Sequence, residues 1–314
     1  TIGPDALAWI QSLAGLPEGV TLRAPLTVSA ARLRSTGTGS AASRTLTVNA
    51  KTESGTAISL ALRHEPGLLS IDNLHVKDSD SDGEVKFSRG PGGIEFSFAG
   101  NLAGATVDRV IERGRISSAW LQGDLRAQAP HGTWREATIY GSLEGGKFSL
   151  PVSQEIPVTV DRFTVNAEGS TVGLRPVVLS LGQDVLQVEG TASLSEDGIG
   201  LDLDIATEQI SLSSVRALVD RKTQERPAGE ASAPDRGPGV SGSVRLHAAS
   251  FLLDRYRADA LEAQVTFGSG RTAATLEHAS ICGVAVTGSL RTVGSEIEVS
   301  FQPQALGKKL EDSL

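Results

Sequence analysis

The chain has 314 residues, of which 39% are apolar and 21% charged, a balance typical of folded rather than disordered proteins. Its formal net charge is −8 and its lysines and arginines are dispersed, which excludes the basic patch that nucleic-acid binding requires. The longest apolar run, residues 6–10, is far shorter than the ~20 residues that span a bilayer. We therefore expect a globular chain that neither binds nucleic acid nor crosses a membrane.

The residue content favours an all-β fold. Glycine is frequent at 35 residues, aromatic residues make up only 4%, and serine, threonine and valine are abundant. No methionine occurs, even at position 1, which predicts a fragment or a processed product. The single cysteine, Cys282, allows no intrachain disulfide, so cysteine content does not indicate the compartment. We expect Cys282 to be a small buried apolar residue.

The first third of the chain begins and ends with helical patterns. Residues 5–13 follow Pro4 and carry apolar side chains at helical spacing, which predicts a short helix. Between Leu22 and Leu102, apolar and polar residues alternate in segments separated by turn residues, the pattern of strands with one apolar face. Residues 105–112 then predict a second short helix.

The segment 184–219 shows the repeating pattern most clearly. Apolar residues alternate with polar ones from Leu186 to Leu194, residues 195–198 supply a turn, and the alternation resumes from Ile199 to Ile205. Ser211 or Ser213 can then cap a short helix within residues 211–221, whose apolar positions have helical spacing. This segment predicts a strand, a turn, a second strand and a short helix.

A low-complexity segment divides the chain. Residues 222–240 contain no bulky apolar residue before Val240 and predict a disordered loop. We expect residues 1–221 to form the main body. Residues 241–314 are then a carboxyl-terminal segment with a terminal helix around Leu306, Leu310 and Leu314.

The strands outnumber the helices that could cover them. About 18 strand candidates occur, more than one open twisted sheet usually carries without curling or splitting. Only a few short helices are predicted, so the apolar face must be covered mainly by other strands. The pattern predicts an all-β fold, an elongated curled antiparallel sheet that forms a sandwich, a solenoid or a groove.

One acidic turn resembles the start of a calcium-binding loop. Asp78, Asp80 and Asp82 alternate and Gly83 follows, but Arg89 occupies the twelfth position, where a bidentate carboxylate is needed. We interpret this turn as a solvated acidic hairpin, with an adventitious ion site as the alternative.

Catalytic signatures are missing from the sequence. The five histidines are scattered without metal-ligand spacing, and neither a G-x-S-x-G elbow nor a Walker loop occurs. We predict no catalytic residue, no metal site and no cofactor, and therefore no enzyme.

Three passages resemble the AsmA-like family of bacterial envelope proteins, the group of AsmA, TamB and YhdP. Residues 279–290, Ala-Ser-Ile-Cys-Gly-Val-Ala-Val-Thr-Gly-Ser-Leu, resemble the family's carboxyl-terminal strand pair. The other two passages run from Val76 to Leu102 and from Leu186 to Val219.

The resemblance implies a repeating β-groove with a hydrophobic lining. It also implies a periplasmic location, an amino-terminal inner-membrane anchor that this sequence lacks, and a part in moving phospholipid toward the outer membrane. The family has no catalytic residues to carry over, so the functional positions would be the groove lining. We expect ten residues to line it: Phe96, Phe98, Leu186, Val188, Leu201, Leu203, Val286, Ile297, Val299 and Phe301.

An acyl chain of 16 carbons costs on the order of 12 kcal/mol to expose to water, so a lipid conduit needs an unbroken apolar floor. The predicted function is therefore binding or conduction of phospholipid or other lipid acyl chains in the cell envelope. In the structural alternative, the same residues pack against each other as a closed sandwich core.

Two other functions remain open. A structural module could assist outer-membrane protein assembly by pairing a sheet edge with strands of outer-membrane β-barrel proteins. A β-solenoid enzyme acting on polysaccharide would need clustered aromatic or acidic residues, and the only tryptophans are Trp9, Trp120 and Trp134.

Overall fold

A computed structural model describes residues 26–37, 42–111, 118–131, 133, 136–150, 158–195, 198–214, 239–253, 256–268, 271–293 and 296–304. The chain divides into two compact units, and each is described by itself. Unit 1 comprises Thr1–Phe148 and Thr164–Ser170, and unit 2 comprises Ser149–Phe163 and Thr171–Leu314. The predicted helix at 5–13, most of the predicted loop at 222–240 and the predicted terminal helix lie outside the described residues.

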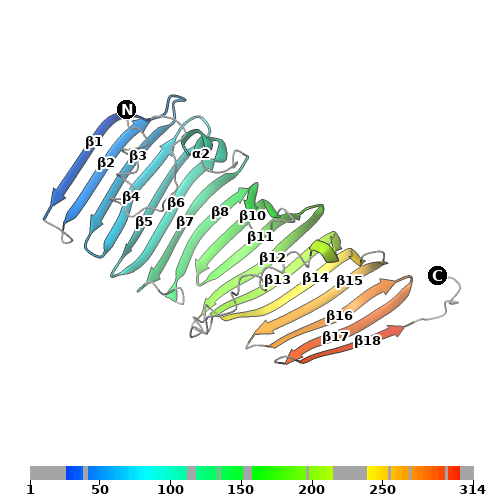
Figure 1. The fold of residues 1–314 in the computed structure, drawn as a ribbon. Coiled ribbons are helices and arrows are strands. Elements are labelled where there is room, and N and C mark those ends of the chain that lie inside the picture. Colours follow the sequence, from blue (N-terminus) through cyan, green and yellow to red (C-terminus); the bar gives the residue numbers. More distant parts are fainter. Residues whose placement is uncertain are drawn as a thin grey trace, which may run out of the picture. The chain divides into compact units, whose positions relative to one another are not determined.

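Unit 1 is an antiparallel sheet in which each strand pairs with the next along the chain (Figure 1). A short helix, α2 (Gly104–Val110), follows the sixth strand, where a helix was predicted at 105–112. The strands are β1 (Thr27–Thr36), β2 (Ser43–Lys51), β3 (Ala57–Glu65), β4 (Leu68–Lys77), β5 (Asp82–Gly90), β6 (Gly93–Ala103), β7 (Trp120–Pro130) and β8 (Thr138–Gly146). Residues of β9 (Phe148–Leu150) and β10 (Val158–Gly169) belong to both units.

Unit 2 is also a sheet of sequential strands, with one parallel pair. Its strands are β11 (Thr171–Leu181), β12 (Asp184–Ser195), β13 (Gly198–Ser211), β14 (Gly239–Leu253), β15 (Tyr256–Gly268), β16 (Arg271–Ile281), β17 (Val284–Val293) and β18 (Glu296–Gln304). The other neighbours from β11 to β18 pair antiparallel.

One neighbouring pair departs from the antiparallel arrangement. β13 and β14 run in the same direction, and Gly239, the first residue of β14, lies opposite Gly198, the first residue of β13. Parallel neighbours are joined by connections of a dozen or more residues, in contrast to the short turns of hairpins. Residues 212–214 are helical, at the start of the helix predicted for 211–221. Gly239 and Val240, predicted as loop, already belong to β14.

Cross-strand register gives the unit 1 sheet one continuous apolar face. Two rows of directly opposed residues define this unit 1 apolar face. The first row is Val48, Leu60, Leu74, Val85, Phe98 and Leu125, and the second is Leu46, Leu62, Ile71, Phe87, Phe96, Ala127 and Ile139. Because side chains alternate along a strand, the intervening polar residues lie on the opposite face.

The unit 2 sheet has the same organisation. Two rows define the unit 2 apolar face. The first row is Val177, Val188, Ile205, Leu246, Ala263, Leu276, Gly288 and Phe301, and the second is Leu203, Val244, Val265, Ala274, Leu290 and Val299. The all-β prediction is confirmed, with sheets that are apolar on one face and polar on the other.

Glycines inside strands allow the sheet to curl. Gly100 and Gly123 oppose each other in β6 and β7 and have φ of 110° and 147°. A Cβ at Gly100 would collide with the backbone oxygen of Asp82, and one at Gly123 with that of Ser142. Such glycine kinks are one way in which a twisted sheet acquires curvature.

Cys282 does not occupy the buried position expected from the sequence. It is exposed, and with Gly283 it forms the two-residue turn between β16 and β17. Both residues have positive φ, 52° and 76°, as the tight turn of a hairpin requires. The turn geometry therefore places this side chain outside the core.

Candidate functional site

Side chains on the unit 2 apolar face are buried at some strands, which we call the closed region, and exposed at others, which we call the open region. Leu181 and Leu186 are 2% and 6% exposed, whereas Leu290, Val299 and Phe301 are 36%, 49% and 64% exposed. The buried end is a cluster of Val158, Leu181, Leu186, Ile210 and Ala248, with Leu179, Ile205, Phe251 and Leu261 packed against it. The face is therefore exposed at Leu290 of β17 and at Val299 and Phe301 of β18, although Val188, in the same row as Phe301, is buried.

The unit 1 apolar face shows a similar mixture. Leu46, Val48, Ala50 and Leu62 form a buried cluster, and Phe98 is 2% exposed. Phe96, two residues away on the same face, is 38% exposed. Leu33, which opposes Leu46 from β1, is 47% exposed. Protein atoms therefore cover only part of this face.

The structure places nine of the ten predicted lining residues on the apolar faces of their units, and the side chain of the tenth, Ile297, is outside the described part of the chain. Phe96 and Phe98 lie in β6 of unit 1, and the other eight lie in unit 2. Phe98, Leu186 and Val188 are buried against protein, and Leu201, Leu203 and Val286 are partly buried. Phe96, Val299 and Phe301 are exposed, and Ile297 occupies the position opposite Thr292.

Sequence reasoning missed several residues that complete these rows. Leu74, Val85 and Leu125 continue the row of Phe98, and Val265 and Leu290 continue the row of Leu203. Each has the period-two alternation of its own strand. The missing information was the register between hairpins, which the alternation alone does not define.

The opposite faces carry ion pairs between neighbouring strands. In unit 2, Arg245 donates to Asp204 from Nε at 2.5 Å and Nη2 at 2.9 Å. In unit 1, Arg63 donates to Asp72 at 2.8 Å. This hydrogen bond holds the pKa of Asp72 below its usual range, although partial burial opposes the shift. These contacts indicate that the polar faces are directed to solvent.

A shallow cavity of about 670 Å³ lies on the polar side of unit 1. Its lining includes Arg63, Lys86 and Arg126, and each faces a carboxylate. The partners are Asp72 at 2.8 Å, Glu84 at 2.8 Å and Asp124 at 3.6 Å. With Glu95 the lining carries three cations and four carboxylates, so most of its charge is compensated within ion pairs and no excess of positive charge is offered to an anionic ligand.

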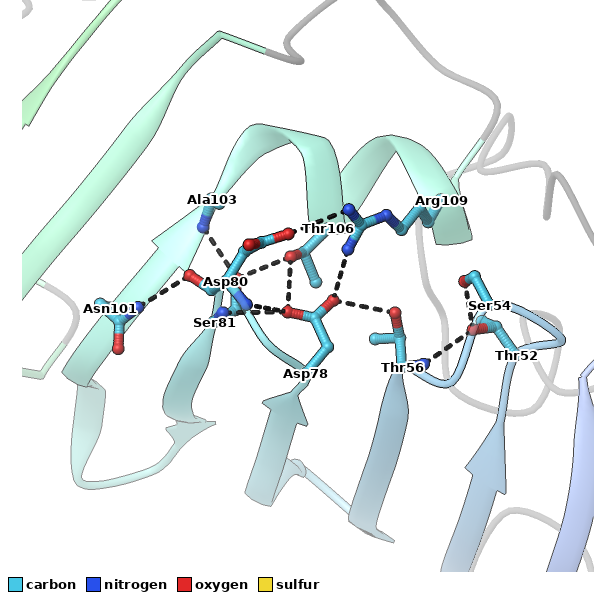
Figure 2. Close-up of polar contacts among 10 residues, drawn as sticks. All are labelled: Thr52, Ser54, Thr56, Asp78, Asp80, Ser81, Asn101, Ala103, Thr106 and Arg109. Atoms are coloured by element: carbon cyan, nitrogen blue, oxygen red, sulfur yellow. Dashed lines mark hydrogen bonds and ion pairs between the residues drawn. The ribbon is translucent and has the colours of Figure 1, made fainter.

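A buried polar cluster, the Asp78 lock, fastens α2 to the strand ends of unit 1 (Figure 2). Asp78 accepts hydrogen bonds from Thr56 Oγ1 at 2.9 Å, Thr106 Oγ1 at 3.1 Å and Arg109 Nη1 at 3.1 Å. The backbone N–H groups of Asp80 and Ser81 each donate to it at 2.9 Å. Among the described residues, the largest side chains with under 2% exposure are Thr56 and Thr106.

The expectation of a solvated acidic hairpin was wrong for Asp78, whose side chain is 6% exposed and accepts the hydrogen bonds of the Asp78 lock. Burial alone would raise the pKa of Asp78, but hydrogen bonds from Asp80 N, Thr56, Thr106 and Ser81 N outweigh it and hold that pKa below its usual range. Arg109 bridges to Asp80 at 2.9 Å. The Asp78 carboxylate thus serves to hold α2 against the strand ends. No group of three or more potential metal-ligating residues occurs in the described part of the chain.

Unit 2 contains a comparable cluster, the Asp184 lock. Asp184 Oδ2 accepts hydrogen bonds from the backbone N and Oγ of Ser211, both at 3.0 Å, and from Ser214 Oγ at 2.6 Å. Asp184 and Ser214 are 4% and 5% exposed. Ser214 lies in the helical residues 212–214, so the lock joins the start of β12 to the chain that leaves β13. It lies beside the closed end of the unit 2 apolar face, since Leu186 follows Asp184 by two residues.

The described residues contain no helix that is both long and apolar enough to pass through a lipid bilayer. Comparisons with known proteins gave no match among protein-family models, curated proteins or solved structures.

Proposed function

We propose that this chain is a periplasmic segment of an AsmA-like protein that binds or conducts phospholipid acyl chains along its apolar sheet faces. In the full-length protein an inner-membrane anchor would hold it between the inner and outer membranes. The observation that carries the proposal is the exposure of Leu290, Val299 and Phe301 on a sheet face that also carries the buried Leu186 and Val188. A contiguous exposed apolar surface marks a site of binding.

Energetics supports an apolar ligand at this surface. Removing apolar surface from water contributes about 25 cal/mol per Å². An acyl chain lying along a row would cover several neighbouring side chains at once, and each buried methylene would contribute roughly 0.8 kcal/mol. The rows contain no charged residue. An acyl chain bound along them would therefore bury no unpaired charge and would cause no desolvation penalty of that kind.

The resemblance to the AsmA-like family supports the same proposal from the sequence. Residues 279–290 span the end of β16, the Cys282–Gly283 turn and the first part of β17. Within this hairpin, Val286 and Leu290 lie on the unit 2 apolar face and Gly288 lies beneath the ring of Phe301. The passage that carries the resemblance therefore builds the open part of the face.

The test compares the two faces of a single strand. Purified protein, wild type or variant, is analysed by native mass spectrometry after incubation with phosphatidylethanolamine and phosphatidylglycerol vesicles. We expect Val299→Asp with Phe301→Asp to lower lipid occupancy at least tenfold, because charge on the apolar face is incompatible with an acyl chain. The matched control is Ser300→Asp with Gln302→Asp, on the polar face of β18, which should keep wild-type occupancy. Absence of lipid from the wild type, or equal occupancy in both variants, would refute acyl-chain binding.

A second function, pairing with strands of outer-membrane proteins, is favoured by the exposed residues of β1 and of β18. An unpaired strand can add a client strand through backbone hydrogen bonds. Photo-crosslinkers at Ala31 and Ser300 would then capture an unfolded outer-membrane protein, and Val299→Pro with Phe301→Pro would abolish capture at Ser300, because proline removes backbone donors from β18. Capture at Ser300 that persists in this proline variant would contradict edge pairing.

A further inference from the structure

Each unit contains a strand with one exposed edge. Among the described strands, the contacts of β1 are with β2, and those of β18 are with β17. Residues 29–36 of β1 and 298–304 of β18 are all exposed. An exposed edge presents unpaired backbone N–H and C=O groups, which favour pairing with another strand.

The two edges carry charges of opposite sign on equivalent faces. Arg32 and Arg34 lie on the polar face of β1, since Leu33 between them opposes Leu46 of the apolar face. Glu298 lies on the polar face of β18, next to Val299 of the apolar face. No ion pair among the described residues involves Arg32, Arg34 or Glu298, in contrast to the paired Arg245 and Asp204 of the sheet interior.

We propose that β18 of one copy of this chain pairs antiparallel with β1 of a second copy. In the register that opposes Arg32 to Glu298, Arg34 falls opposite position 296, which is also a glutamate. Ala31 then falls opposite Val299 and Leu33 opposite position 297, so apolar positions share one face. Directly opposed pairs of opposite charge or of apolar residues stabilise an antiparallel ladder.

Charge also selects this pairing over its alternatives. Two β1 edges would bring arginines together and two β18 edges would bring glutamates together, and like charges directly opposite destabilise a strand pair. The contact is therefore between different surfaces of the two copies. Such a contact generates an open linear assembly rather than a closed dimer. The apolar face of β18 in one copy would continue onto that of β1 in the next. This association does not depend on lipid binding.

The first test exchanges the charges. By sedimentation velocity, wild-type protein should associate with increasing concentration, and added salt should weaken the association because the charges are exposed. Arg32→Glu with Arg34→Glu, and separately Glu296→Arg with Glu298→Arg, should each lower association at least fivefold. A mixture of these two double variants should regain it, because each acidic edge then meets a basic one. Lys86→Glu, a charge reversal within the sheet of unit 1, is the control that should associate as the wild type does.

The second test reads the register directly. In a Cys282→Ser background, Ala31→Cys with Val299→Cys should give disulfide-linked multimers on mild oxidation, because opposed residues have Cα atoms about 4.5–5.5 Å apart. Ala31→Cys with Phe301→Cys is displaced by two residues and should crosslink several-fold less. A monomeric wild type at all concentrations, association unaffected by charge reversal, or equal crosslinking in both registers would each overturn the proposal. Captured client strands with no multimers would also overturn it.

Discussion

The unit 2 apolar face contrasts a closed region around β12 with an open region on β17 and β18. Leu186 is buried in a cluster beside the Asp184 lock and Val188, two residues further along β12, is also buried, whereas Val299 and Phe301 extend the same face into solvent. Side chains in the closed region contribute to folding through burial, and those in the open region leave their apolar surface exposed to solvent. Under the proposed function, one repeating pattern in the sequence would serve stability in one place and lipid binding in another.

The largest expected effect is from shortening a side chain in the closed region. Leu186→Ala should lower the free energy of unfolding by about 2–5 kcal/mol, the usual cost of an apolar cavity in a packed core. Urea titration followed by circular dichroism measures this change. A loss below ~1 kcal/mol would show that the cluster around β12 is not a packed core.

Removal of the Asp184 lock should have the next largest effect on the free energy of unfolding. Asp184→Ala leaves the donors of Ser211 and Ser214 without their acceptor, which should cost about 1–3 kcal/mol. Hydrogen exchange should speed up for the first residues of β12 and leave β18 unchanged. Equal acceleration in both strands would contradict a local role for this lock.

The Asp78 lock of unit 1 should make stability depend on pH in a defined direction. Its pKa is lower in the folded protein than in the unfolded chain, where aspartate titrates near 3.9. The ionised carboxylate therefore stabilises the fold above that value, and this contribution is lost as pH falls through the lower folded pKa. The stability difference between wild type and Asp78→Asn, from urea titrations at a series of pH values, should shrink on acidification. A difference that is constant down to acidic pH would contradict the ionised lock.

The smallest expected effect on stability is in the open region. Phe301→Ala should change the free energy of unfolding by less than ~0.5 kcal/mol, as is usual for exposed positions. The same variant should bind less phospholipid than the wild type in native mass spectra. A stability loss as large as that of Leu186→Ala would show that Phe301 belongs to the core, and the contrast between the two regions would disappear.

The strands and their apolar faces follow from local sequence patterns. The exposure of each side chain and the parallel pairing depend on strands that are distant in the sequence. Period-two alternation indicated the correct face for Leu201, Leu203 and Val299 because face is a property of one strand. Exposure differs between Leu186 and Phe301 because it depends on neighbouring strands and covering segments, which no single strand specifies. The parallel pairing of β13 and β14 depends on a connection of low complexity, without a pattern that reveals its path.

The candidate site was predictable to a similar degree. The sheet face of the proposed lining residues follows from their alternation, whereas the hydrogen-bonding roles of Asp78 and Asp184 do not follow from any local pattern. Asp78 meets Thr106 and Arg109 only after α2 folds over the strand ends, and these partners are 28 and 31 residues away in the chain. The acidic turn therefore resembled a solvated hairpin in sequence, although its first carboxylate is buried.

Photo-crosslinking along β17 and β18 tests the central claim most directly. Wild-type protein is incubated with phosphatidylethanolamine vesicles that contain a phospholipid with a photoactivatable group on its acyl chain, and labelled residues are mapped by mass spectrometry. The account predicts labels that alternate along each strand, on Leu290, Val299 and Phe301 but not on Ser289, Ser300 or Gln302. Labels of equal strength on both faces, or labels restricted to the polar face, would contradict acyl-chain binding by the open apolar face.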